Sequence, residues 1–165
     1  MKLLCLQSTS IFDRYGGVEY YLNDLLQELA KRFGDRNVTT IVPISGHLRQ
    51  ISPPKYQVNK VTISSRGIWR KFDNRFPIRM FFKAIWIAWR TNPDLILGGH
   101  VSLGPLAFLL SKITRRPYVL VAYGIDVWGK LYPQDEWCLR QAHAIVSISY
   151  CTKNILINVL SILNS

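Results

Sequence analysis

The sequence has few acidic residues to set against its basic ones. Ten Asp and Glu oppose twenty-one Lys and Arg across 165 residues, which leaves a formal net charge of +11. Hydrophobic residues make up 48% of the chain, and this share excludes a disordered basic tail. A chain of this length buries roughly 68–70% of its unfolded surface, enough for one core without disulfides or metal. We therefore expect one folded domain.

Cysteines and long apolar runs are also scarce. Cys5, Cys138 and Cys151 are odd in number, far apart, and outside any CxxC or Cys/His spacing of a zinc site. The apolar stretches are shorter than the roughly 18–20 residues that a membrane-spanning helix needs. Only three apolar residues and a Cys separate Lys2 from Gln7, too few for a signal peptide. These absences predict a reduced, cytoplasmic location.

Several motifs of enzyme chemistry are missing as well. The sequence contains no GxGxxG run, no GxxxxGK[ST] run and no DxD pair. It also shows no Ser/His/Asp or Cys/His nucleophilic set. We expect no metal and no dinucleotide cofactor.

Basic side chains are concentrated in the middle of the chain. Residues 36–90 contain eleven Lys and Arg against a single acid, Asp73, whereas the segments on either side are close to neutral. Three of the five tryptophans fall in the same region. A regional patch that is both basic and aromatic indicates an anionic partner, either a lipid headgroup layer or a nucleic acid.

Helical spacing in this region favours the membrane. Ile78, Phe81, Phe82, Ile85 and Trp89 fall on one predicted stripe, and the basic residues lie off it. No nucleic-acid motif is present, so we expect no nucleic-acid partner. The alternative is a helix that packs its apolar face on a sheet and leaves its basic residues solvated. On the membrane interpretation, the expected contact residues are Arg70, Lys71, Arg79, Lys83, Trp86 and Trp89.

Short apolar runs alternate with helical patterns along the chain. The predicted strands are residues 2–7, 38–42, 61–64, 94–97, 118–123 and 144–147. The predicted helices run from Gly17 towards Gly34, over 103–113, and from near Ser149 through Leu160. This alternation predicts an α/β fold, a Rossmann-like parallel sheet with helices on both faces.

Candidate site residues follow these strands, where ligands collect in such sheets. Gly16 and Gly17 open the first helix, and they either expose backbone amides to an anion or form a tight turn. His100 is either structural or a group that orients a sugar hydroxyl or transfers a proton. Asp126 either accepts hydrogen bonds from hydroxyl groups or caps a turn. Tyr123 offers a hydroxyl, although an aromatic residue in a strand commonly belongs to the core.

Four segments in series resemble the amino-terminal half of a family 4 glycosyltransferase of GT-B architecture. They are GGVEYYLNDLLQELAKRFG (16–34), NPDLILGGH (92–100), RRPYVLVAYGIDVW (115–128) and HAIVSISYCTKNIL (143–156). Each motif is weak alone, but their order and spacing match throughout. The resemblance implies that residues 1–165 form the acceptor-side domain, a single domain equal to one half of a GT-B fold.

The resemblance also implies a reaction. A sugar would pass from a nucleotide-diphosphate donor to a lipid-linked or polysaccharide acceptor, with retention of configuration and without a bound metal. Such work belongs to cell-envelope polysaccharide biosynthesis, at the inner face of the cell membrane.

Individual positions carry over by their match to the family motifs. Tyr123 stands where the family has an active-site histidine, and a tyrosine cannot become a cation near neutral pH. The resemblance and the strand positions together imply catalytic roles for Tyr123, Asp126 and His100, and donor-phosphate or substrate binding by Gly16, Gly17, Gly124 and Ser149.

The family's second domain binds the nucleotide sugar through two glutamates eight positions apart, and no such pair occurs here. We therefore expect the donor-binding domain to be absent from this chain and the chain to be inactive by itself. A separate donor-domain chain is then an expected partner. The alternatives are a non-catalytic module that binds a membrane surface or a glycan, and a truncated remnant of a glycosyltransferase.

Overall fold

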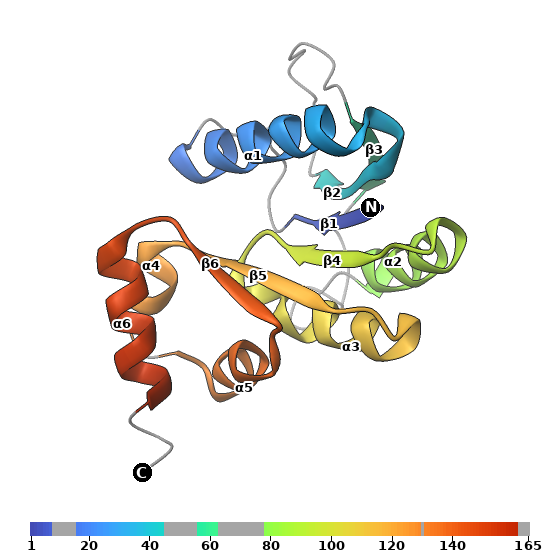
Figure 1. Ribbon diagram of the computed structural model, residues 1–165. Coiled ribbons are helices and arrows are strands. Elements are labelled where there is room, and N and C mark those ends of the chain that lie inside the picture. The colour runs from blue at the N-terminus through green and yellow to red at the C-terminus, as the bar shows by residue number, and fades with distance from the viewer. Residues whose placement is uncertain (8–15, 45–55, 63–77, 130, 162–165) are drawn as a thin grey trace.

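The computed structural model describes residues 1–7, 16–44, 56–62, 78–129 and 131–161. Within these ranges the strands form one parallel sheet in the order β3-β2-β1-β4-β5-β6 (Figure 1). The strands are β1 (Leu3–Leu6), β2 (Val38–Ile44), β3 (Gln57–Thr62), β4 (Leu95–Gly98), β5 (Tyr118–Ala122) and β6 (Ala144–Ser147). The helices are α1 (Gly17–Phe33), α2 (Ile78–Thr91), α3 (Gly104–Thr114), α4 (Gly124–Val127), α5 (Pro133–Gln141) and α6 (Tyr150–Ser161), with the short 3-10 helices η1 (Asp35–Asn37) and η3 (Val101–Leu103).

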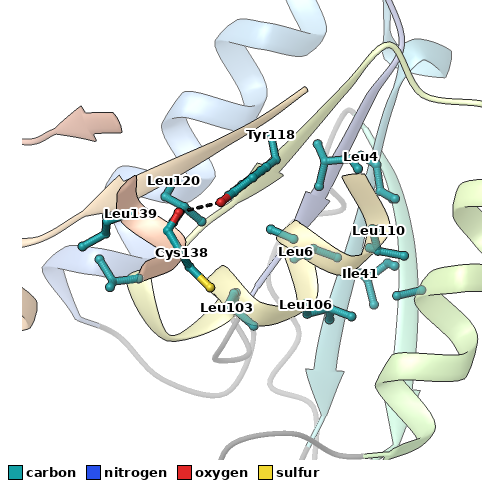
Figure 2. Packing of buried hydrophobic residues seen from close by; sticks show 14 of the residues in the cluster. Leu4, Leu6, Ile41, Leu103, Leu106, Leu110, Tyr118, Leu120, Cys138 and Leu139 are labelled. Atoms are coloured by element: carbon teal, nitrogen blue, oxygen red, sulfur yellow. Dashed lines mark hydrogen bonds between the residues drawn. The ribbon is translucent and has the colours of Figure 1, made fainter. Parts of the chain in front are cut away.

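Apolar side chains cover both faces of the sheet, as the near-continuous apolar runs of its central strands require. Leu3 and Cys5 of β1 pack in a cluster with α1, whereas Leu4 and Leu6 pack on the other face with α2 and α3. Figure 1 shows α1 on one side of the sheet and α2 and α3 on the other, and Figure 2 shows the packing of the second cluster. The predicted parallel sheet with helices on both faces is confirmed.

α1 begins and ends where the sequence predicts. Its buried positions Leu22, Leu26 and Ala30 recur at intervals of four and face the sheet. Gly34 follows the last helical residue with φ of 92°, a conformation that glycine adopts without a steric penalty. The Asn37 side chain then donates to the free carbonyl of Phe33 at 2.7 Å.

One predicted strand starts too late. β3 begins at Gln57 rather than at residue 61, and it pairs with β2 as far as Ile44. Residues 61 and 62 belong to it as predicted, whereas 63 and 64 lie outside the described residues. Pro43 favours a loop in the sequence, but it lies beyond Ile41, the last residue of β2 that pairs with β1. Its missing N–H is therefore tolerated near the margin of the sheet.

The predicted apolar stripe of α2 is also corrected. The buried side chains of this helix are Met80, Ala84, Ile87 and Ala88. Phe81 and Ile85 pack against the same core but are only half-buried, so they lie at the border between the buried and the exposed face. Phe82 and Trp89 of the predicted stripe are exposed, and Trp86 is exposed with them. In the part of the chain that the structure describes, no helix has the length and apolar character to cross a membrane.

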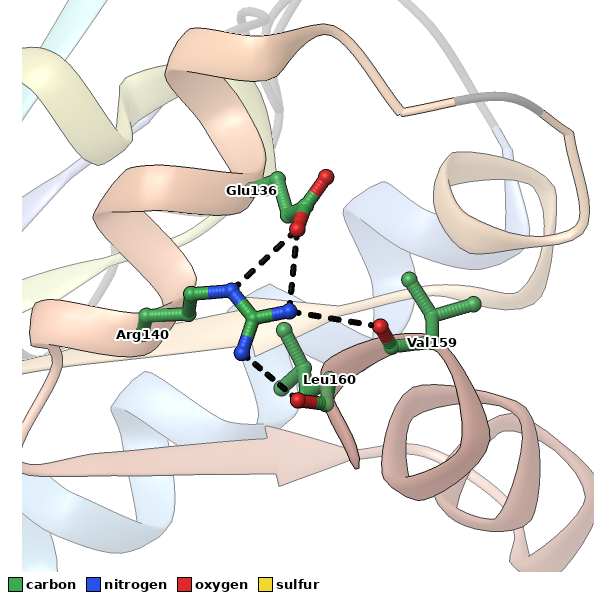
Figure 3. Close-up of polar contacts among 4 residues, drawn as sticks. All are labelled: Glu136, Arg140, Val159 and Leu160. Carbon is green, nitrogen blue, oxygen red and sulfur yellow. Dashed lines mark hydrogen bonds and ion pairs between the residues drawn. The ribbon is translucent and has the colours of Figure 1, made fainter. Parts of the chain in front are cut away.

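α4 and α5, between β5 and β6, have no counterpart among the predicted helices. α5 begins with Pro133 and carries Asp135 and Glu136 in its first turn, a start signal that was present in the sequence. Arg140 of α5 donates to the carbonyl oxygens of Leu160 at 2.6 Å and Val159 at 3.4 Å, and it pairs with Glu136 (Figure 3). This side chain therefore caps the carboxyl end of α6.

Candidate functional site at the carboxyl edge of the sheet

The strand order places a topological switch point between β1 and β4. From β1 the chain proceeds outward through β2 and β3, and it then returns to β4 and proceeds the other way. The carboxyl ends of β1 and β4 lie side by side, and the Gly99 N–H after β4 donates to the Leu6 carbonyl of β1 at 2.8 Å. A Cβ at Gly99 would lie 2.9 Å from that oxygen and 2.8 Å from a Leu22 methyl. Ligands of open parallel sheets bind at such an edge.

His100 lies directly after this contact and pairs with a carboxylate. Its Nε2 is 2.9 Å from Asp126 Oδ1. The backbone N–H of Ser102 donates to Nδ1 at 3.2 Å. Since a backbone N–H can only donate, Nδ1 accepts, and the proton of the neutral ring is on Nε2, facing Asp126. The Asp126 side chain is only 6% exposed, whereas that of His100 is 27% exposed.

Asp126 joins two loops of the edge. Its Oδ2 accepts a hydrogen bond from the Tyr123 N–H at 3.1 Å, so the carboxylate caps the short helix α4. Its Oδ1 contacts His100, which follows β4. Capping is one of the two roles predicted for Asp126, and the structure shows it. The same side chain holds the ends of β4 and β5 together.

Tyr123 is buried beneath this pair. Its ring lies 6.0 Å from that of His100 and 6.1 Å from that of Tyr21 in α1. Its hydroxyl is buried and has no hydrogen-bond partner among the described residues. Burial raises the pKa of this hydroxyl well above its ordinary value, and nearby Cys5 and Tyr21 raise it further. The hydroxyl thus stays protonated, and a substrate could reach it only if covering side chains moved.

Gly16 and Gly17 lie at the start of α1, as predicted. Gly16 is the N-cap residue in an extended conformation, and the Tyr20 N–H donates to its carbonyl at 3.1 Å. A Cβ on Gly16 would lie 2.4 Å from Glu19 Oε2, so the Glu19 carboxylate lies against this glycine. A Cβ on Gly17 would meet no atom within 4 Å. An acidic group therefore covers part of the predicted anion site.

Gly124 and Ser149 begin the helices that follow β5 and β6. A Cβ at Gly124 would lie 2.5 Å from the Trp128 ring, so any other residue there would require that exposed indole to move. Ser149 Oγ accepts from the Thr152 N–H at 3.1 Å, which makes it the N-cap of α6. Ser149 is exposed, and it forms hydrogen bonds with Thr152 and Lys153 in the first turn of α6.

The structure thus brings together part of the predicted site. The side chain of His100 contacts those of Tyr123 and Asp126. Tyr21, near the start of α1, packs its ring against that of Tyr123. Ser149 lies one strand further along the sheet. Of the predicted membrane contacts, Arg70 and Lys71 lie outside the described residues, as does the side chain of Arg79, whereas Lys83, Trp86 and Trp89 are on α2.

Two contributors to the site were missed in the sequence. Ser102 fixes the ring of His100 from two positions away, and Glu19 stands at the third helical position after the N-cap Gly16. The second has a recognisable signal, because an acidic residue at that position commonly reaches back to the helix start. Within the described ranges, no group of three or more His, Cys, Asp or Glu side chains could hold a metal ion.

The fold and the edge cluster together define a Rossmann-like domain, and domains of this class bind ligands where their parallel strands end. Solved structures of the same fold include HepE of Anabaena in complex with UDP, at 18% identity and a TM-score of 0.65. They also include the lipopolysaccharide outer core galactosyltransferase WaaB in its apo form, at 14% identity and a TM-score of 0.68. Each alignment covers 96% of this chain, but 40% of HepE and 42% of WaaB. A search of curated protein sequences found no match.

A family model settles the assignment. The model for Glycosyltransferase Family 4 matches residues 15–163, nearly the whole chain. The chain belongs to Glycosyltransferase Family 4, and its fold is a Rossmann-like single domain that resembles one half of a GT-B enzyme. The chain spans about two fifths of the length of the solved structures it matches.

Proposed function

We propose that this chain forms the acceptor-side wall of a sugar-transfer site. It would take part in moving a sugar from a nucleotide-diphosphate donor to a lipid-linked or polysaccharide acceptor. The observation that carries the proposal is the His100–Asp126 pair beside the start of α1, at the switch point of a family 4 domain. HepE has been solved in complex with UDP, with UDP and glucose, and with UDP-glucose, which supports a nucleotide sugar as the donor.

In this proposal His100 and Asp126 shape the wall and bind hydroxyl groups. Both nitrogens of His100 and both oxygens of Asp126 have partners. The exposed edge of the imidazole can still contact a sugar hydroxyl, while Asp126 fixes the orientation of the ring. Tyr123 supports the pair from below, and we assign its hydroxyl no contact with substrate.

The negative charge of Glu19 distinguishes between the two substrates, acceptor and donor, that could bind next to Gly16. A carboxylate accepts hydrogen bonds from sugar hydroxyls but repels a diphosphate. Its position against Gly16 therefore favours a hydroxyl-bearing acceptor there. Contact of the donor phosphates with Gly16 and Gly17 would require Glu19 to move. We expect Glu19→Gln to bind UDP about fivefold more tightly in calorimetric titrations, since repulsion between like charges about 4 Å apart in bulk water is worth about 1 kcal/mol. Unchanged or weaker UDP binding would contradict this arrangement.

Catalysis needs a second wall in this proposal. Stabilisation of the leaving diphosphate comes from groups positioned on the donor side, and one wall cannot surround the reacting centre. That donor-binding wall can belong to the same polypeptide or to a separate chain. We expect no metal requirement, so transfer should persist in EDTA.

The test is a transfer assay with labelled UDP-glucose and GDP-mannose and a lipid extract as acceptor, run with and without a donor-binding partner. We expect His100→Ala to lower transfer at least about tenfold, because it removes a ring that is held in a fixed orientation against the substrate. Lys153→Gln on α6 is the control, since its side chain is exposed and outside the edge cluster. Equal transfer by wild type and His100→Ala would reject the assignment. Glycan or lipid binding without transfer under any condition would favour a non-catalytic module.

A further inference from the structure

α2 carries an exposed aromatic stripe made of Phe82, Trp86 and Trp89. Successive spacings of four and three residues place these side chains on one face of the helix. They are 64%, 51% and 80% exposed. Single exposed apolar residues are ordinary, but a run of three large aromatic side chains on one helix indicates an interaction surface.

The helix is fixed with this stripe outward. Met80, Ala84, Ile87 and Ala88 of its opposite face are buried in the core cluster that α2 shares with α3 and the sheet. Figure 1 shows α2 beside α3, on the outside of the domain. The stripe could turn inward only if these four side chains left the core, which would cost several kcal/mol. The aromatic surface is thus a permanent feature of the fold.

Charge defines the partner that this surface fits. The Arg90 guanidinium lies 5.3 Å from the Trp86 ring centroid, and Lys83 directly follows Phe82. α2 contains no Asp or Glu, and residues 36–90 contain a single acid among eleven basic residues. Tryptophan rings and basic side chains are together typical of the boundary between lipid headgroups and acyl chains.

We propose that the aromatic stripe of α2 docks the protein onto an anionic lipid bilayer. The indoles of Trp86 and Trp89 enter the boundary between headgroups and acyl chains, and Lys83 and Arg90 meet lipid phosphates beside them. The helix then lies in the plane of the interface, because its other face is held in the core. A second copy of this chain is a poorer occupant, since both molecules carry a net charge of +11.

The experiment is sedimentation of the purified protein with vesicles of phosphatidylcholine, alone or mixed with phosphatidylglycerol, over a series of salt concentrations. We expect binding to the mixed vesicles only, and weaker binding as salt rises. The double variant Trp86→Ala/Trp89→Ala should lower partitioning at least about tenfold, because each buried aromatic side chain removes a large apolar area from water. Lys83→Gln and Arg90→Gln should each lower it about fivefold.

Controls separate lipid docking from general effects of the substitutions. Trp128→Ala removes a tryptophan of similar exposure just after α4, and Lys153→Gln removes a basic residue from α6. Both should sediment like wild type, and far-ultraviolet circular dichroism checks that every variant is folded. Lipids with brominated acyl chains should quench wild-type fluorescence, and quenching should decrease in the double variant.

Three results would overturn the proposal. The first is no binding of wild type to anionic vesicles. The second is binding that the Trp86→Ala/Trp89→Ala variant retains in full, which would assign it to another basic region. The third is self-association that depends on the stripe without lipid binding, measured by light scattering, which would make the stripe an interface between copies.

Discussion

Replacement of Asp126 by Asn should destabilise the protein even though the side chain keeps its size. The amide oxygen can still accept from the Tyr123 N–H, but the amide NH2 would then face His100 Nε2. Since Ser102 donates to Nδ1, the ring cannot offer an acceptor at Nε2 without losing that bond. A lost hydrogen bond to a charged group costs about 1.5–3 kcal/mol of stability. The new amide NH2 and the His100 Nε2–H would also face each other as two donors without an acceptor, which adds to the cost. We therefore expect a loss of about 2–3 kcal/mol.

Thermal unfolding measures this effect. In a domain of this size, 1 kcal/mol shifts Tm by about 2–4 °C, so Asp126→Asn should melt about 5–10 °C below wild type. Asp94→Asn is the control, because its carboxylate is exposed and bonded to the Lys2 backbone, and it should change Tm little. In a double-mutant cycle, adding Asp126→Asn to His100→Ala should cost less than it does alone. Strict additivity, or a Tm of Asp126→Asn equal to that of wild type, would refute the pairing.

Further predictions concern the last helices and the thiols. Arg140→Ala should lower the free energy of unfolding by about 1–3 kcal/mol, because it uncaps two carbonyls of α6, and urea titration measures the loss. Ser149→Ala should cost about 1 kcal/mol and speed hydrogen exchange in the first turn of α6. In native protein, Ellman's reagent should modify exposed Cys151 but not buried Cys5 and Cys138. Modification of all three without denaturant would contradict the described packing.

The same buried thiols predict a pH dependence of stability. Burial raises the pKa of Cys138 from 9.0 to about 11 and that of Cys5 to about 12. Above pH 9 the unfolded chain loses these protons while the folded chain keeps them, so the unfolded state binds fewer protons. The free energy of unfolding should be unaffected by these groups below pH 9 and fall from pH 9 to about 11 or 12. Cys138→Ala should reduce that decline, as urea titrations across the alkaline range would measure.

Much of the fold was predictable from the sequence because local signals and burial agree there. The apolar run at β1 and the glycine at position 34 mark a buried strand and a helix end in any context. The start of β3 was predicted too late because its Gln and Asn interrupt the apolar run that is typical of a strand. Pairing with β2, which is not a local signal, places these residues in the sheet. The stripe of α2 was misassigned because the helix is apolar on both faces, and spacing alone cannot tell which face meets the sheet.

The candidate site was predictable as a location but not as chemistry. Strand ends identified His100 and Asp126, since the edge of a parallel sheet collects such residues. Their mutual contact joins loops 26 residues apart, and no local pattern encodes it. The contact of Glu19 with Gly16 was predictable, because an acidic residue at the third helical position commonly reaches back to the helix start. The burial of Tyr123 was not, because it depends on packing against Tyr21 and the sheet.

The most direct test of the central claim, that ligands bind at the carboxyl edge of this sheet, is a nuclear magnetic resonance titration. The uniformly 15N-labelled chain would be titrated with a short oligosaccharide, as a hydroxyl-bearing acceptor, and with UDP-glucose. The largest amide shifts should fall at Gly17, His100 and Gly124, which lie at that edge, with little change at Gly34, at the far end of α1. Shifts centred away from this edge, or none with either ligand, would contradict the account.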